Sequence, residues 1–186
     1  MTEPSDEALM KAYAEGDMPA FEQLYQRYRG PLYRYILRLV GDPPTANDLY
    51  QGSWEKIIAA RRRYEASAPF RAWVFRIAHN HAVDHFRRTR SLAFSAHHAP
   101  APDDLATANP GPEQALASTQ AATRLEAALR ELPDEQRQAL LLKLEAGLDL
   151  RAIAEVTGVN PETAKSRLRY ATARLKAVLA EACEEA

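Results

Sequence analysis

Three closely spaced cations could bind a polyanion: Lys165, Arg167 and Arg169 follow directly after Asn160-Pro161. Asn160 is a good helix N-cap and Pro161 suits a first helical turn, so a helix is predicted to begin there. Side chains in the first turns of such a helix can reach base edges and phosphates in the major groove of DNA. The pattern predicts a DNA contact by Thr163, Lys165, Ser166, Arg167 and Arg169.

The residues before this helix complete a helix-turn-helix over residues 150–175. Ala154 lets two helices approach closely, Gly158 accepts a left-handed turn conformation, and Val159 fills the seam between the helices. The less specific interpretation is a solvated cationic helix in an ordinary bundle. The ordered turn signals favour the helix-turn-helix.

Charge is segregated along the chain, although the whole sequence carries only −1. Residues 1–24 carry −5 and residues 91–118 carry −3, whereas residues 61–90 carry +6 and residues 161–176 carry +4. Two basic segments separated by an acidic connector predict two contacts with a polyanion.

The first basic segment contains a loop and a helix. Tyr64 and the arginines of loop 61–69 could hold an unstacked base, because stacking and cationic steering favour single-strand capture. On the helix, Asn80 can read a base edge, while Asp84 is expected to orient a neighbouring arginine. The alternative is that the aromatic residues form the core, as we expect for Trp73 and Phe86, and the arginines only solvate it. The candidate DNA contacts are Arg62, Arg63, Tyr64, Arg76, Asn80, Arg87 and Arg88.

Helical periodicity runs through both halves of the chain, and no segment alternates like a strand. The predicted fold is all-α, with two small helical domains joined by a flexible linker, the second containing the helix-turn-helix. The predicted boundaries are 1–92, 93–118 and 119–186. In the first domain, a helix ending at Gly41 is followed by helices from near Thr45 to about Arg62 and over residues 70–90.

The linker, 93–118, holds four of the twelve prolines and has little apolar periodicity. It cannot bury enough surface to offset its ordering entropy, so we expect it to be mobile. In the free protein the domains should then either tumble independently or both dock onto a partner. No apolar run is long enough to span a membrane, and the single cysteine fits a reducing cytoplasm. The predicted location is therefore cytoplasmic.

The histidines suggest a weaker alternative, a zinc-dependent enzyme, because His81 and His85 lie one turn apart. A third ligand and a glutamate between the pair are missing, so neither a metal nor a cofactor is predicted. His97 and His98 lie within the linker, where a solvated pair is favoured over a metal site.

Four motifs occur in order: DLYQ at 48–51, FRAWVFRIAHNHAVDHFRR at 70–88, LPDEQRQALLL at 132–142 and ETAKSRLRYATARL at 162–175. Together they resemble the extracytoplasmic-function (ECF) sigma factors, the promoter-specificity subunits of bacterial RNA polymerase. The resemblance implies that the first domain engages the polymerase clamp and melts the −10 element. It implies that the second domain reads the −35 element and touches the flap, while the linker threads toward the RNA exit channel.

The resemblance also implies which residues act, and that polymerase rather than this chain performs the chemistry. Contacts to the polymerase core would come from Asp48, Leu49, Gln51 and Trp54. An alternative within DNA binding is a helix-turn-helix regulator that binds an operator without polymerase.

The chain departs from the family pattern in the clamp-binding helix, where Thr45, Asn47 and Gly52 replace acids. Weak docking is therefore expected for the unmodified protein. A phosphate on Thr45 would restore negative charge at a helix N-terminus, which favours anions, so Thr45 is a candidate for a serine/threonine kinase. The other interpretation is that Thr45 is an N-cap, and Ser53 is a weaker candidate. By resemblance, an anti-sigma protein is the alternative regulator, which the sequence itself neither shows nor excludes.

Overall fold

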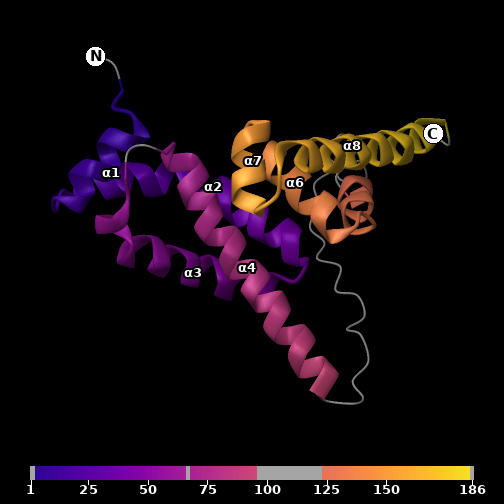
Figure 1. Cartoon of the computed structure of the whole chain (residues 1–186), viewed down its shortest axis with the longest axis horizontal. Helices are drawn as coiled ribbons and strands as arrows, with labels where there is room; N and C mark the ends of the chain where they lie inside the picture. Colours follow the sequence, from indigo (N-terminus) through magenta and orange to yellow (C-terminus); the bar gives the residue numbers. More distant parts are fainter. Residues whose placement is uncertain (1–2, 66–67, 96–122, 185–186) are drawn as a thin grey trace, which may run out of the picture.

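The computed structural model describes residues 3–65, 68–95 and 123–184 of the 186-residue chain, and these residues contain helices but no strand. Figure 1 shows two groups of helices lying against each other, with α8 running to the C-terminus. The predicted all-α fold is confirmed.

The first group contains α1 (Asp6–Ala14), α2 (Met18–Val40), α3 (Pro43–Ala59), the 3₁₀ turn η1 (Arg61–Arg63) and α4 (Phe70–Ser95). Helix α1 was not predicted, because its short acidic sequence carries a weak apolar pattern. It nevertheless buries three side chains against α2 and α4. A short amphipathic segment is thus stabilised by packing rather than by propensity.

The start of α3 differs from the prediction because the cap was misassigned. Asp42, not Thr45, is the N-cap, and its carboxylate accepts the Thr45 N–H at 2.9 Å. The helix therefore starts at Pro43, where proline is tolerated. Helix α2 ends at Gly41 (φ 76°), as expected.

The second group contains helical residues 123–130, α6 (Asp134–Leu144), α7 (Leu150–Thr157) and α8 (Pro161–Glu184). Its helix-turn-helix is confirmed in detail. Gly158 adopts the left-handed conformation (φ 68°), and Asn160 Oδ1 accepts the Thr163 N–H at 2.8 Å.

The two groups lie packed against each other in this structure. Helix α4 packs against α7, helix α2 packs against α6, and one buried cluster runs through both groups. Of the predicted linker 93–118, residues 93–95 form the end of α4, and the remainder lies outside the described residues.

Candidate nucleic-acid and polymerase interface

Helix α8 carries the five residues predicted to contact DNA in its first turns. Ala164 is fully buried and holds the helix against the domain, while Lys165 and Arg169 are exposed. Within the described residues, neither Lys165 nor Arg167 takes part in an ion pair. The Arg169 guanidinium lies 4.9 Å from the Tyr170 ring centroid, and no carboxylate in the described part of the chain neutralises it. This surface is therefore available to phosphates without rearrangement. The other three, Thr163, Ser166 and Arg167, are half-buried.

The second cationic surface is formed by η1 and α4. Asn80 is exposed, and Asp84 Oδ1 lies 3.8 Å from Arg87 Nη1, which confirms the expected orienting contact. Both side chains of this pair are largely exposed, so their attraction is weak. The other exposed cations that the sequence singled out are Arg62, Arg63 and Arg88.

Tyr64, predicted to stack on an unpaired base, is half-buried in an aromatic cluster. Its ring centroid lies 5.6 Å from that of Phe70 and 5.2 Å from that of Trp73. Its hydroxyl donates to the Ala68 carbonyl at 2.8 Å, and burial raises its pKa to about 12. Tyr64 therefore shapes the loop, and only part of the side chain is open to a base.

Arg76 points toward the second domain, although its side chain remains 42% exposed. Its Nη2 lies 3.5 Å from Glu155 Oε2 of α7, and its Nε is buried without a hydrogen-bond partner among the described residues. A predicted DNA contact thus lies where α4 meets α7, in the contact region between the two domains that we call the seam. Unlike Lys165 and Arg167 of α8, Arg76 already has an acidic partner.

Glu145 is the main polar contact across this seam. Its side chain is only 6% exposed, and its carboxylate accepts hydrogen bonds from Arg34 Nε at 2.8 Å and from Arg38. Next to it, Arg71 Nη1 donates to the Ala146 carbonyl at 3.4 Å. A carboxylate buried among arginines is strongly destabilised when its partners are removed, so these contacts hold the domains together.

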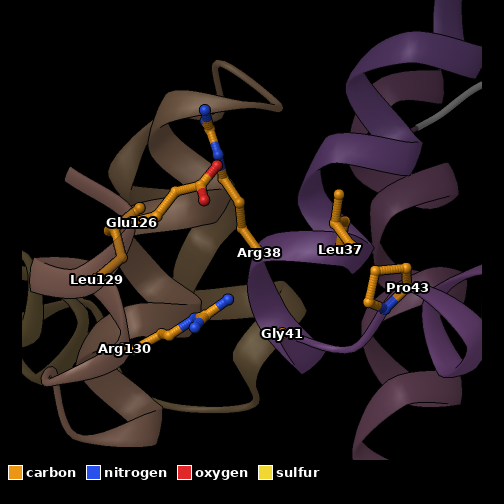
Figure 2. A pocket seen from close by; sticks show the side chains of 7 residues that line it. All are labelled: Leu37, Arg38, Gly41, Pro43, Glu126, Leu129 and Arg130. Carbon is orange, nitrogen blue, oxygen red and sulfur yellow. The ribbon is translucent and has the colours of Figure 1, made fainter. Parts of the chain in front are cut away.

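The seam also contains a cavity of about 210 Å³ near the end of α2. Figure 2 shows Arg38 on one side and Glu126 and Arg130 on the other, with Gly41 at the helix end. This pocket is partly open to solvent, and beside it apolar side chains of both groups belong to one buried cluster. The seam therefore combines apolar packing with charged contacts.

The predicted polymerase contacts of α3 divide into two kinds. Asp48 and Gln51 are exposed, whereas Leu49 and Trp54 are buried. Trp54 lies at the base of an apolar groove of about 600 Å³ between α2 and α3. Sequence reasoning missed the rest of this groove, although Phe21 and Tyr25, which α2 contributes to it, lie in a segment with helical periodicity. It is lined by Phe21, Tyr25, Asn47, Tyr50, Gln51, Trp54, Glu55 and Ile58.

Gly52 and Ser53 do not lie on the exposed face of α3. A Cβ at Gly52 would lie 2.5 Å from His81 Cε1, so this glycine permits close packing of α3 on α4. The interpretation of Gly52 as a missing acid of the docking face is therefore wrong. Ser53 is fully buried and donates to the Leu49 carbonyl at 2.6 Å, which makes it unsuitable for phosphorylation.

Thr45 is half-buried at the first turn of α3. The interpretation of Thr45 as the N-cap is wrong, because Asp42 fills that role. Hydrogen bonds from Thr45 hold the pKa of the Asp42 carboxyl below its usual value. A phosphate on Thr45 would therefore have to share the helix N-terminus with an existing carboxylate.

The histidines of α4 serve in packing. His79 is buried, its Nδ1 lies 3.0 Å from the Tyr35 hydroxyl, and burial lowers its pKa to about 4. His81 contacts α3, and burial lowers its pKa as well. No cluster of three potential metal ligands occurs within the described part of the chain.

Comparison with known proteins matches the two helical groups separately. The family description for sigma-70 region 2 matches residues 24–92, and that for sigma-70 region 4 matches residues 122–175. The chain is 31% identical to the ECF RNA polymerase sigma factor SigE of Mycolicibacterium smegmatis, over 98% of this chain and 72% of SigE. It is also 31% identical to the RNA polymerase sigma factor CnrH of Cupriavidus metallidurans, over 95% of each chain. The chain is an ECF sigma factor.

Solved structures agree on the fold. CnrH in complex with the cytosolic domain of CnrY gives a TM-score of 0.69 at 24% identity, covering 96% of this chain and 99% of CnrH. The sigma factor RpoE of Bartonella quintana, in complex with the anti-sigma factor NepR, gives a TM-score of 0.70 at 25% identity, covering 86% of this chain and 96% of RpoE.

As an ECF sigma factor, this chain directs core RNA polymerase to promoter DNA. Its family consists of specificity subunits rather than enzymes, which replaces the zinc-enzyme and stand-alone regulator alternatives. Among the described residues, no helix is long and apolar enough to cross a membrane.

Proposed function

We propose that this sigma factor reads the −35 element with the first turns of α8 and the −10 element with loop 61–69 and α4. The observation that carries the proposal is the position of Lys165 and Arg167. They lie on the second helix of a capped helix-turn-helix and are not engaged by carboxylates of the described residues. For the −10 element, the exposed Asn80 and the arginines of η1 supply the polar and cationic groups.

Footprinting with core polymerase tests the assignment. The probe is a promoter that the wild-type holoenzyme selects from a duplex library randomised at both elements. Replacing Lys165, Arg167 and Arg169 together with alanine should abolish protection of the −35 element, and Asn80→Ala should relax preference at one −10 position. The matched control is Arg174→Ala on the same helix. Unchanged −35 protection in the triple variant would contradict the proposal.

The contact with the polymerase clamp is proposed for α3 and its groove. Asp48 and Gln51 would meet the clamp directly, while Leu49 and Trp54 support the groove from within. An apolar groove with polar groups at its rim can combine burial with orientation. Asp48→Ala should weaken core binding, with the exposed Glu15→Ala as the control for loss of one acid.

The docked arrangement is proposed to be the form that precedes promoter binding. The two elements lie about 25 base pairs apart, which at about 3.4 Å per pair is on the order of 80 Å. In the docked form, by contrast, Arg76 of α4 contacts Glu155 of α7. Residues 96–122 could extend to on the order of 90 Å, so the chain is long enough for the domains to separate.

Regulation is proposed at two levels in the cytoplasm. An anti-sigma protein would bind this chain, as NepR and CnrY bind the two solved relatives. A serine/threonine kinase would phosphorylate Thr45, displacing Asp42 from the helix N-terminus and adding charge beside the exposed Asn47 and Asp48.

Core affinity of unmodified, Thr45→Ala and phosphorylated protein tests the kinase proposal. Phosphorylation should tighten core binding, whereas the alanine variant should bind as the unmodified protein does. Tight binding that ignores phosphorylation would leave Thr45 as an ordinary residue of the first turn.

A further inference from the structure

The first turn of α4 is capped by a residue from a different helix. Pro69 precedes the helix and has no side-chain oxygen that could accept a free backbone N–H. The Phe70 N–H instead donates to Glu7 Oε1 of α1 at 3.0 Å, across 63 positions in sequence. A carboxylate in this place also interacts favourably with the positive end of the helix.

Glu7 is held in place by its neighbour on α1. Asp6 Oδ1 accepts from Arg27 Nη1 at 2.6 Å, and Asp6 Oδ2 accepts from the Tyr28 hydroxyl. Arg27 also donates to the Pro4 carbonyl at 3.0 Å. Helix α1 is thereby fixed on α2, with Glu7 aimed at the start of α4.

The residue that Glu7 holds is central to the loop before α4. The Phe70 ring is buried and contacts Tyr64 at 5.6 Å and Tyr28 at 5.3 Å between centroids. Tyr64 in turn closes the loop through its hydrogen bond to Ala68. A shift of the first turn of α4 would therefore move the loop that carries Arg62 and Arg63.

We propose that Glu7 is a positioning residue for −10 recognition: by capping α4 from α1, it fixes the position of Arg62, Arg63 and Tyr64 relative to single-stranded DNA. The inference deepens the proposed function and rests on it. Glu7 makes no DNA contact of its own, because a carboxylate repels phosphates and its oxygen already accepts the Phe70 N–H. Helix α1 precedes the residues that the region 2 family description matches, so this role is not part of that match.

The experiment compares Glu7→Ala, which removes the acceptor, with Glu7→Gln, which keeps an oxygen and removes the charge. Glu15→Ala is the matched control, an exposed acid at the end of the same helix. Amide hydrogen exchange at Phe70 is measured in the full chain. Holoenzymes are then tested against a single-stranded −10 oligonucleotide and a −35 duplex, both from the promoter that the wild-type holoenzyme selects.

For Glu7→Ala we expect faster Phe70 exchange and an affinity for the −10 oligonucleotide that falls by on the order of three- to tenfold, the range produced by loss of a helix cap. Core affinity and −35 binding should stay unchanged. Glu7→Gln should remain within about twofold of wild type, and Glu15→Ala should match wild type.

Two results would overturn the inference while leaving the proposed function intact. One is wild-type affinity for the −10 oligonucleotide in Glu7→Ala despite faster Phe70 exchange. The other is an equal loss of core, −35 and −10 binding, which would make Glu7 a general stability residue. If the wild-type holoenzyme selects no −10 sequence at all, the proposed function itself fails, and this inference with it.

Discussion

Helices α4 and α8 both present clustered cations, yet the two surfaces differ in what already occupies them. On α8, Lys165 and Arg167 have no acidic partner within the described residues. On α4, Arg71 and Arg76 contact the second domain, and Arg90 Nη2 lies 3.9 Å from Asp134 Oδ2 of α6. Similar local charge therefore gives one surface that is free and one that is partly engaged by the rest of the molecule.

The difference indicates an order of events. Under the proposed assignment, the α8 surface can meet the −35 element as it stands, whereas full exposure of the α4 surface to the −10 element requires α7 and α6 to leave α4. The seam combines apolar packing with charged contacts, and we propose that it opens when the complex with polymerase and promoter forms, because interfaces between the domains of one chain commonly permit relative motion.

The largest effect is expected from charge reversal at the seam. Glu145→Arg would place three arginines together, and loss of a largely buried partner costs up to about 3–5 kcal/mol. The half-exposed Arg34 reduces that figure, but the domains should separate, and small-angle X-ray scattering should show a larger radius of gyration. Glu131→Arg is the control, because Glu131 pairs with Arg174 within the second domain. Equal compactness of the two variants would refute the role of Glu145.

The next effect concerns α8. Replacing Lys165, Arg167 and Arg169 with alanine should weaken −35 binding and reduce the slope of its salt dependence by about 0.9 for each phosphate that the variant no longer neutralises. The weakening should be equal in the wild-type and Glu145→Arg backgrounds, because the surface is free in both. Binding measured at several salt concentrations tests this, and a weakening that depends on the background would show that α8 is also occluded.

Acid should destabilise the first helical group, because His79 of α4 lies in its core. The folded pKa of about 4 lies below the unfolded value of about 6.5, so the folded state binds fewer protons between these values. The contribution of neutral His79 to the free energy of unfolding is fully present above pH 6.5 and declines as pH falls toward 4, by roughly 2 kcal/mol at pH 5. Urea unfolding at pH 7 and at pH 5 measures this loss of unfolding free energy. His79→Leu should lose most of this dependence, and an unchanged dependence would assign it to other groups.

The smallest effect distinguishes packing from helix propensity at Gly52. Gly52→Ala gains about 1 kcal/mol of helix propensity, but its Cβ would clash with His81 at a cost of roughly 1–3 kcal/mol. We expect a net loss of about 1 kcal/mol in wild type and a gain of similar size in the His81→Ala background. Thermal or urea unfolding of wild type, the two single variants and the double variant measures the sign of the stability change in each background. A loss in both backgrounds would indicate that His81 is not the obstacle.

Much of this fold could be predicted from local sequence signals. The turn at Gly158 and the cap at Asn160 depend on neighbouring residues, so the helix-turn-helix is predictable in detail. The predicted start of α3 is displaced because Asp42 and Thr45 are both good caps, and only the chain direction after Gly41 decides between them.

The seam and the buried positions could not be predicted, because they depend on contacts between distant residues. Glu145 resembles any solvated acid until Arg34 and Arg38 are brought beside it. Similarly, Gly52 resembles a missing acid until the fold places His81 against it. The candidate DNA contacts could be chosen as cations from sequence, but their availability is a tertiary property.

Single-molecule energy transfer across the seam tests the central claim most directly. One dye is placed at the only cysteine, Cys183, and the other at the exposed Gln26→Cys on α2. We expect one population in the free protein and a shift to lower transfer with core polymerase and promoter DNA. Unchanged transfer in the transcribing complex would contradict the claim, because the domains would then never separate.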